Sequence, residues 1–400
     1  MRNTDVAIVG GGLAGSLAAA MLGRSHIDAI LIDPHPVYPP DFRCEKLDGA
    51  QVELLQKTGL ADAVLRAATP DRESWVARFG RVVDKRRGDQ HGIFYAPLVN
   101  TVRNLIPDNV ITMRAKATAL ATSNERQRVT LSNGEEISAR LIVLANGLNI
   151  SLRHILGLTR EILSECHSIS IGFNVTPTRR RSFDFPALTY YAENTRDHAA
   201  LLTLFPIGSA MRANLFVYRD VSDPWLRDMR SSPQQAMLAL MPGLRELMGE
   251  FEVEGPVKVR PVDLYTTRGY RQPGVVLVGD AFSTSCPAAG TGARKALNDV
   301  ERLCNVHIRS WLATQGMDAG KIGSFYDDPV KRACDTFSLN KAYDLRAFSI
   351  EPSLLWNARR WIKFLGQYGV GMLRSISQKL AAQFRTGRSL PAATKSGEAL

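Results

Sequence analysis

Several features that mark other protein classes are missing from this chain of 400 residues. No stretch reaches the ~20 consecutive apolar residues of a membrane-spanning helix, so we predict no transmembrane segment. The five cysteines are odd in number and contain no Cys-x-x-Cys pair, which argues against a disulfide framework and against a zinc site. We therefore expect no metal and a reducing, cytoplasmic setting. The chain also has no internal repeat and no low-complexity segment.

The composition is that of a folded enzyme. Hydrophobic residues make up 45% of the chain and charged residues 22%, and the length is enough for two or three domains with sizeable cores. The formal net charge of +11 can attract anionic cofactors and substrates, or can simply keep the protein soluble. The basic clusters at residues 85–87 and 179–181 carry no interleaved aromatic residues, so we expect no nucleic-acid partner.

The first 33 residues have the pattern of a dinucleotide-binding βαβ unit. An apolar strand at residues 6–9 leads into six residues that open a helix, and a second strand at residues 29–32 ends at Asp33. In such a unit the first glycine permits a tight turn, the second lets the backbone approach a pyrophosphate, and the third allows close helix packing. The phosphates lie at the helix N-terminus, and the acidic residue bonds a ribose. The predicted cofactor-binding residues are Gly10, Gly12, Leu13, Ala14, Gly15 and Asp33.

The remaining pattern predicts an α/β region interrupted by an antiparallel sheet. Period-two alternation predicts strands at 168–175, 188–192, 199–205 and 212–218, with one helical insertion at 233–248. Further predicted helices lie at 49–59, 61–68 and 98–105, further strands at 75–83, 92–95, 110–113, 129–131, 141–144 and 275–278, and a hairpin turn at Asn133-Gly134.

A second constellation follows the strand at 275–278. It consists of Gly279-Asp280-Ala281, Pro287, Gly290-Thr291-Gly292 and Asp299, with a helix predicted at 293–308. These spacings are similar to the second flavin fingerprint of the FAD-dependent aromatic hydroxylases, the p-hydroxybenzoate hydroxylase-like group A flavoprotein monooxygenases. The resemblance also includes Arg43 and the segment from Asn146-Gly147 to Arg153, and so extends over about three quarters of the chain.

The resemblance implies roles for these residues. Asp280 would accept a hydrogen bond from a ribityl hydroxyl of FAD, and Pro287 and Arg43 would lie at the reacting flavin as the catalytic candidates. Gly290, Thr291 and Gly292 open a helix whose positive end would stabilise the anionic reduced flavin. Asn146 and Gly147 would also contact the cofactor.

This chain departs from the family at several positions. Asn146 stands where the family has an aspartate implicated in flavin and nicotinamide binding, so that carboxylate is lost. Phe282-Ser283 replace the usual Ala-His, Arg294 replaces Asn, and Ala96-Pro97 stand where an Arg or Gln is expected. These differences imply an outlying branch of the family.

The activity implied is that of a monooxygenase of specialised metabolism. NAD(P)H, bound transiently, would reduce FAD, O₂ would be captured as a flavin hydroperoxide, and one oxygen atom would hydroxylate or epoxidise an electron-rich aromatic or polyene small molecule. A separate flavin reductase is an alternative source of electrons. An isoprenoid reductase of the geranylgeranyl type and a non-catalytic FAD-binding protein stay open as alternatives. A flavin-dependent halogenase is disfavoured because no two tryptophans are two residues apart, as that family's Trp-x-Trp-x-Ile-Pro motif requires.

The implied fold class is α/β, with a Rossmann-like FAD-binding domain, an inserted antiparallel-sheet substrate domain and C-terminal helices. The FAD-binding domain would comprise residues 1–72, 98–165 and 266–330, and the substrate domain 73–97 and 166–265. A helical region would follow at 331–388 and a disordered tail at 389–400. The candidate pocket aromatics are Tyr190, Tyr191, Phe205, Tyr218 and Tyr265.

The C-terminal helical region is basic and amphipathic. From residue 352 onward the chain has eight basic residues and one acidic residue, and apolar residues recur at helical spacing between 354 and 372. Such a helix can lie on an anionic membrane surface, or its apolar side can pack on the flavin domain. We favour packing on the flavin domain. Gly366, Gly369 and Gly371 weaken the helix, at about 1 kcal/mol each relative to alanine.

Overall fold

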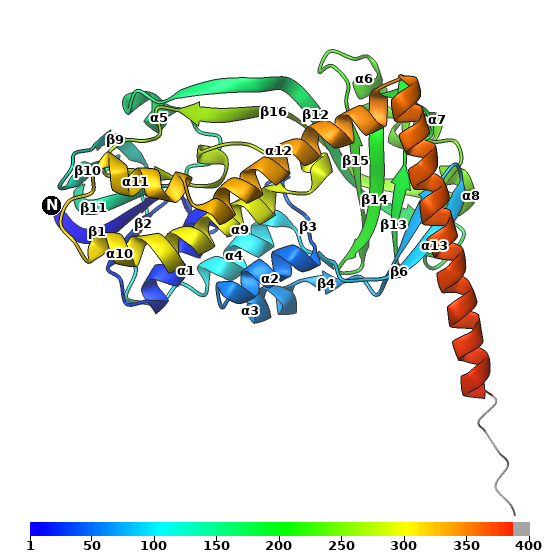
Figure 1. The fold of residues 1–400 in the computed structure, drawn as a ribbon, viewed down its shortest axis with the longest axis horizontal. Helices are drawn as coiled ribbons and strands as arrows, with labels where there is room; N and C mark the ends of the chain where they lie inside the picture. Colours follow the sequence, from blue (N-terminus) through cyan, green and yellow to red (C-terminus); the bar gives the residue numbers. More distant parts are fainter. Residues whose placement is uncertain (387–400) are drawn as a thin grey trace, which may run out of the picture.

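A computed structural model describes residues 1–386. The described residues form two seven-stranded sheets and one three-stranded sheet. Helices pack around the first sheet, and the C-terminal helices extend from it to the second sheet (Figure 1). This confirms the α/β class with a Rossmann-like domain and a second, largely antiparallel sheet. The tail expected to be disordered, 389–400, lies outside the described residues. No helix among residues 1–386 is long and apolar enough to cross a membrane.

The first sheet is built around two parallel strands. β1 and β11 pair along their whole length, and the strand order is β8-β2-β1-β11-β10-β9, with β17 pairing the second half of β11. β10 and β9 are antiparallel to their neighbours and extend the sheet at one edge. The strands are β1 (Arg2–Val9), β2 (Ala29–Ile32), β8 (Ile111–Met113), β9 (Ala117–Ala121), β10 (Gln127–Leu131), β11 (Glu136–Leu144) and β17 (Val275–Leu277).

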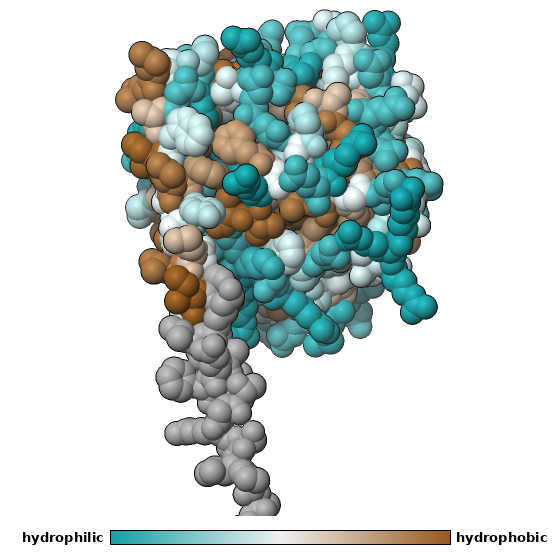
Figure 2. All heavy atoms as spheres, turned by 90° about the vertical axis from the view of Figure 1, so that its right-hand side faces the viewer, coloured by the Kyte–Doolittle hydropathy of each residue, from teal (hydrophilic) through white to brown (hydrophobic). Residues whose placement is uncertain are grey.

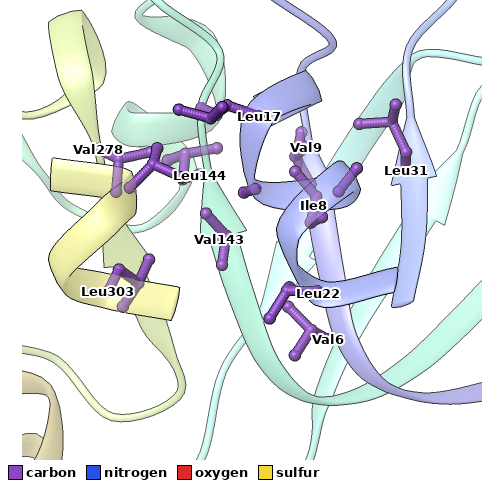
Figure 3. Close-up of a cluster of buried hydrophobic side chains, with 14 of the residues drawn as sticks. Val6, Ile8, Val9, Leu17, Leu22, Leu31, Val143, Leu144, Val278 and Leu303 are labelled. Atoms are coloured by element: carbon purple, nitrogen blue, oxygen red, sulfur yellow. The ribbon is translucent and has the colours of Figure 1, made fainter. Parts of the chain in front are cut away.

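Apolar side chains on both faces bury this sheet. Helix α1 (Leu13–Arg24) covers one face, and ten of its twelve residues are buried. Figure 3 shows Val6 and Ile8 of β1, Leu17 of α1, Val143 of β11 and Leu303 gathered in one cluster. Since strands buried on both faces need continuous apolar runs, the sequences VAIV at 6–9 and LIVL at 141–144 form the sheet's centre.

The second sheet has the order β16-β12-β15-β14-β13-β5-β6, and only the β13–β5 pair is parallel. β12 and β16 have 19 and 18 residues and form a long ribbon that ends beside the first sheet (Figure 1). The strands are β5 (Glu73–Arg78), β6 (Arg81–Arg87), β12 (Thr159–Pro177), β13 (Ala187–Tyr191), β14 (Ala199–Ile207), β15 (Ala210–Val217) and β16 (Phe251–Arg268); the small sheet has β3 (Lys46–Leu47), β4 (Thr69–Pro70) and β7 (His91–Gly92).

The first of two consecutive C-terminal helices connects the sheets, and the second lies on the second sheet. Helix α12 (Pro329–Ile350) contacts α9 at the first sheet and β14 in the second, and α13 (Leu354–Thr386) runs along β6 at the outer edge of the second sheet (Figure 1). The other helices are α2 (Gly49–Lys57), α3 (Ala61–Ala67), α4 (Tyr95–Arg103), α5 (Ser151–Ile155), α6 (Trp225–Ser231), α7 (Pro233–Leu240), α8 (Leu244–Met248), α9 (Gly292–Arg302), α10 (Arg309–Leu312) and α11 (Ala319–Tyr326).

The structure corrects several sequence-based predictions. The strand predicted at 92–95 is wrong, because β7 ends at Gly92 and helix α4 begins at Tyr95. The single strand predicted at 75–83 is wrong, because Phe79 and Gly80 have positive φ angles of 50° and 70° and turn the chain into the β5–β6 hairpin. The strand predicted to start at Ser168 begins at Thr159 as part of the ribbon. The apolar side of α13 does not pack on the flavin domain: α13 lies on the hairpin of the second sheet, and most of its large apolar side chains are exposed.

Candidate flavin and substrate site

A cavity of about 650 Å³ lies where the two sheets meet. It is lined by the glycine loop after β1, by residues between Gly279 and Ala293 and by Asn146-Gly147. Residues of β12, β14, β15 and β16 complete the lining. A cavity with one wall from each domain is the arrangement in which a bound cofactor can meet a small molecule.

The glycine loop is shaped by the absence of side chains. Gly10 has a φ of +105°, and a Cβ atom there would lie 2.6 Å from the carbonyl oxygen of Ala145. A Cβ atom on Gly15 would lie 1.8 Å from the carbonyl oxygen of Gly10, so α1 can pack against the loop only with glycine there. Gly12 has nothing closer than 3.9 Å and opens the N-terminus of α1 toward the cavity. Leu13 and Ala14 line the cavity as well, whereas Gly15 lies behind the loop.

Asp33 is fixed at the end of β2 by hydrogen bonds. Its carboxylate accepts from the backbone N–H groups of Gly11 at 2.7 Å and His35 at 2.9 Å, and it pairs with the Arg103 guanidinium at 2.9 Å. Burial alone would raise the pKa of Asp33, but these three donors hold it below its usual value, so the group is anionic at neutral pH. Arg103 also donates to the Gly11 carbonyl oxygen and so ties α4 to the glycine loop.

Arg43 connects the loop after β2 with the second fingerprint. Its guanidinium donates to the Asp280 carboxylate at 2.7 Å across 237 residues of sequence, and also to Asp41. Arg260 of β16 donates to Asp41 at 3.2 Å, so a strand of the second sheet takes part in the same cluster. Although burial opposes the charge of Arg43, the carboxylates of Asp280 and Asp41 raise its pKa further above the ordinary range. The cluster places the guanidinium groups of Arg43 and Arg260 and the carboxylate of Asp280 on the wall of the cavity.

Buried charged side chains hold the second fingerprint, which begins at Gly279, in place. The N–H of Gly279 donates to Asp299 at 2.9 Å, and Asp299 pairs with Lys331 of α12 at 2.7 Å. Lys331 also donates to Asp335 at 3.1 Å, which in turn lies 3.2 Å from Lys295. This cluster of two lysines and two aspartates fixes the loop between β17 and α9.

The departures from the family pattern are accommodated by the same cluster. Lys295 donates to both the carbonyl oxygen and the hydroxyl of Ser283, the residue that stands where the family has histidine. The Lys331 ammonium lies 4.4 Å from the centre of the Phe282 ring, so a cation–π contact fills the space behind the loop. A histidine at 283 is therefore not needed to hold this loop.

The predicted residues of the loop itself take different positions. Pro287 and Gly292 line the cavity, as does Gly290, which has a φ of +67° and accepts at its carbonyl from Gln51 at 3.0 Å. Thr291 faces away from the cavity: its hydroxyl lies 2.7 Å from that of Ser338 on α12, and its residue is buried. Thr291 therefore anchors α9 to α12, and only its backbone could meet a ligand.

Asn146 and Gly147 line the cavity at the end of β11. The Asn146 amide donates to the carbonyl oxygen of Asn149 at 3.0 Å, and its buried Oδ1 atom has no hydrogen-bond partner among residues 1–386. Arg153, fully buried nearby, donates to the Ala281 carbonyl at 2.9 Å and fixes the second fingerprint from this side. The unpaired Oδ1 acceptor of Asn146 on the cavity wall could accept a hydrogen bond from a bound ligand.

The wall from the second sheet combines apolar and polar side chains. Phe205 and Phe216 line it, together with Ser170, whose buried hydroxyl finds no partner in the described part of the chain. Tyr265 also lines the cavity, but Tyr190, Tyr191 and Tyr218 do not. Tyr190 is fully buried and donates to Glu193, and Tyr218 is buried between His167 and Arg346.

A buried ion pair and a lysine at this wall were not anticipated from the sequence. Glu45 accepts from Arg212 of β15 at 2.7 and 3.1 Å, and both side chains are at most 5% exposed. Burial raises the pKa of Glu45 despite this partner. Lys46 lies with its ammonium 5.0 Å from the centre of the Phe205 ring, and burial lowers its pKa to about 8. Glu45 and Lys46 follow Arg43 directly in the sequence, but Arg212 lies 167 residues from Glu45. Sequence spacing therefore gave no signal for this group.

The residues present fit FAD. The glycine loop and helix N-terminus suit a pyrophosphate, the anionic Asp33 suits ribose hydroxyls, and Asp280 with the open acceptor of Asn146 suits the polar groups of a flavin. No group of three or more His, Cys, Asp or Glu side chains in residues 1–386 is arranged to hold a metal ion.

Comparison with known proteins gives consistent matches. The model of the FAD binding domain family matches residues 3–306. The chain is 25% identical over 364 residues to 3-demethoxyubiquinol 3-hydroxylase of Escherichia coli strain K12, covering 86% of this chain and 88% of that protein. It is 24% identical over 389 residues to salicylate hydroxylase of Pseudomonas putida, covering 85% and 86%. Its fold is similar to that of p-nitrophenol 4-monooxygenase PnpA from Pseudomonas putida DLL-E4, with a TM-score of 0.74, 16% identity, and coverage of 96% of this chain and 98% of that one.

Proposed function

The chain belongs to the FAD binding domain family, and on this premise we propose that it is an FAD-dependent monooxygenase that hydroxylates an electron-rich aromatic small molecule. The observation that carries the proposal is the single cavity shared by both flavin fingerprints and by Phe205 and Phe216 of the second sheet. The relatives named as aromatic hydroxylases support the reaction class. Epoxidation of a polyene uses the same oxygen transfer and is the second candidate, supported by 23% identity to squalene epoxidase erg1 of Aspergillus fumigatus.

We assign the cofactor to the residues that the cavity brings together. Gly10, Gly12, Leu13 and Ala14 would hold the pyrophosphate at the α1 N-terminus, with Gly15 behind the loop. Asp33 would hold the adenosine ribose, Asp280 the ribityl chain, and Asn146-Gly147 with the Gly290–Gly292 backbone the ring. When bound, FAD supplies the redox chemistry, because it takes electrons from a reductant and activates O₂.

The chain's own residues position the reactants. One oxygen atom of O₂ goes to the substrate and the other leaves as water, so the site has to keep bulk water out while it orients the ring to be hydroxylated. Phe205 and Phe216 provide an apolar wall, and the unpartnered Ser170 hydroxyl can donate to or accept from a substrate hydroxyl. Arg43 and Pro287, which both line the cavity, are our candidates for contact with the reacting groups.

Two sources of electrons for the reduction of FAD are compatible with the sequence. NAD(P)H bound transiently is typical of the family, and the sequence has no second dinucleotide fingerprint. The loss of a carboxylate at Asn146 is the observation that favours a separate flavin reductase. Reduction of the purified enzyme by NADH or NADPH alone distinguishes the two sources.

A cytoplasmic location and a membrane surface as partner are also proposals. The five cysteines are free thiols, which supports the reducing, cytoplasmic environment that we expected. A peripheral membrane contact of the C-terminal helix rests on the exposed side of α13.

The experiment is a labelled-oxygen assay on the purified protein. We expect a yellow protein with one FAD, reductant oxidation that a phenol, indole or polyene stimulates, and product that carries one atom from isotopically labelled O₂ without any halide. Oxidation of reductant without oxygen uptake would favour an isoprenoid reductase, and absence of turnover with every reductant would favour a non-catalytic FAD-binding protein. Halogenated product in a chloride-containing assay would overturn the proposal.

A further inference from the structure

Helix α13 is oriented with its polar side toward the protein. Arg360 donates to the backbone carbonyl oxygen of Phe348 at 2.7 Å, Gln367 accepts from Arg78 at 3.1 Å, and Arg374 pairs with the buried Asp84 at 3.0 Å. Gly371 lies so close to β6 that a Cβ atom there would be 2.1 Å from the Val83 carbonyl oxygen. The position of the helix on the hairpin is therefore fixed by polar contacts and by one glycine.

Aromatic contacts add to this attachment at one edge. Trp361 stacks on Phe79 at the tip of the β5–β6 hairpin, and Phe364 meets the same ring edge-on. Trp361 is nevertheless 56% exposed. The packed side thus uses Phe364, Gln367, Gly371 and Arg374, and leaves the opposite side of the helix uncovered.

The uncovered side is a stripe of large apolar side chains. Leu355, Ile362, Leu365, Met372 and Ile376 stand at positions linked by spacings of three and four through the small residues Ala358 and Gly369. This places them along one side of a helix, and Leu373 lies next to Met372 on the same side. Ile362 is 70% exposed and Leu373 69% exposed, although residues of this type are usually buried. Figure 2 shows hydrophobic side chains along this edge of the molecule. The outward stripe consists of Leu355, Ile362, Leu365, Met372, Leu373 and Ile376.

A contiguous exposed apolar stripe on a helix needs an occupant, because such surfaces mark interaction sites. Charge selects the kind of occupant. Residues 352–400 contain eight basic residues and one acidic residue, of which Arg360 and Arg374 contact the protein, while Arg359 and residues 85–87 of the adjacent β6 are exposed cations. Two copies of this helix would bring the same positive charges together, whereas an anionic lipid surface would neutralise them.

We propose that the outward stripe of α13 docks on the surface of an anionic lipid bilayer, with the helix lying in the plane of the interface. Leu355, Ile362, Leu365 and Leu373 enter the boundary between headgroups and acyl chains, and Arg359 beside them meets the headgroups. The helix does not cross the bilayer. Docking requires no flavin chemistry and does not depend on the proposed monooxygenase function.

The experiment is sedimentation of the full-length, FAD-loaded protein with vesicles. The probes are vesicles of phosphatidylcholine alone and vesicles with added phosphatidylglycerol, each at low and high salt. We expect the protein to pellet with the anionic vesicles at low salt and to be released by salt, because screening weakens the charge attraction. Failure of the full-length protein to pellet with anionic vesicles at low salt would overturn the proposal.

Matched variants test the stripe itself. The triple variant Ile362→Gln, Leu365→Gln and Leu373→Gln removes three exposed side chains, so folding is preserved and flavin absorbance reports it. Vesicle binding should fall at least about tenfold, since each buried apolar side chain contributes on the order of a factor of ten. The control variant Ile155→Gln, Val221→Gln and Val330→Gln changes three apolar residues elsewhere that are also exposed, at 47–57%, and should bind as the wild type.

Two results would overturn the assignment of the stripe to lipid. One is an equal loss of binding in the control variant, which would show a general effect of exposed apolar groups. The other is a dimer in analytical ultracentrifugation that the triple variant abolishes, which would assign the stripe to a second copy of this chain.

Discussion

The buried cluster beneath the second fingerprint predicts a large loss of stability for Lys331→Met. Lys331 is fully buried, and its ammonium lies 2.7 Å from Asp299 and 3.1 Å from Asp335. Burial by itself would lower the pKa of Lys331, but the two carboxylates raise it, so the group stays charged at neutral pH. Methionine has similar length and no charge, and therefore removes the partner without leaving a large void.

The size of the loss follows from what remains. Asp335 is partly exposed and keeps Lys295 at 3.2 Å, but Asp299 is 1% exposed and is left as a buried carboxylate with only the Gly279 N–H. Removing one partner of a buried ion pair costs about 3–5 kcal/mol. We expect this decrease in the free energy of unfolding of the FAD-binding domain, and weaker retention of FAD because Gly279 begins the loop that carries Asp280.

The assay is urea denaturation followed by tryptophan and flavin fluorescence. Lys57→Met, on the exposed end of α2, serves as the control and should change stability by less than about 0.5 kcal/mol. The double variant Lys331→Met with Asp299→Asn removes the stranded charge and should recover much of the loss. A loss of less than about 1 kcal/mol in Lys331→Met would refute this account of the cluster. So would a double variant whose loss in the free energy of unfolding exceeds the sum of the losses of the two single variants.

Three further predictions concern the cavity. Gly12→Ala should leave the free energy of unfolding of the apoprotein unchanged, because its Cβ meets no protein atom closer than 3.9 Å, but should abolish FAD uptake in a titration, because that Cβ lies at the cavity wall assigned to the pyrophosphate. Gly15→Ala should lower the free energy of unfolding of the apoprotein by about 1–3 kcal/mol or more through the clash with Gly10. Asp280→Ala should weaken FAD binding about tenfold or more, measured by fluorescence quenching, through loss of a charged acceptor. The KM for an anionic aromatic substrate should rise as pH increases through about 8, where Lys46 loses its proton, and this rise should be absent in Lys46→Gln.

Features carried by short sequence spans could be predicted from the sequence. The glycine loop, α1 and Asp33 occupy one continuous βαβ unit, so spacing alone placed them at the same end of the sheet. The second fingerprint was predicted from its resemblance to that of the FAD-dependent aromatic hydroxylases, and the four strands between 168 and 218 were predicted from their alternation. Local chemistry determines each of these elements.

What depends on distant contacts could not be predicted. Arg103 reaches the Gly11 carbonyl across 92 residues, and Arg212 reaches Glu45 across 167, with nothing in the local pattern to mark either pair. The β5–β6 turn was missed because Phe79 occupies a left-handed conformation that glycine or asparagine usually adopts. The orientation of α13 was missed because amphipathicity does not say which side of a helix the rest of the protein covers.

The central position of β11 has a consequence for how the protein is made. β11 pairs with β1, more than 130 residues before it, and with β17, more than 130 residues after it. At translation rates of roughly 5–20 residues per second, the first fingerprint exists for on the order of ten seconds or more before the second leaves the ribosome. The complete FAD site is therefore absent while the edge of β11 that pairs with β17 is still unpaired. Long-range pairing of this kind also slows folding, so the yield of active enzyme should depend more on chaperones during synthesis than on flavin supply.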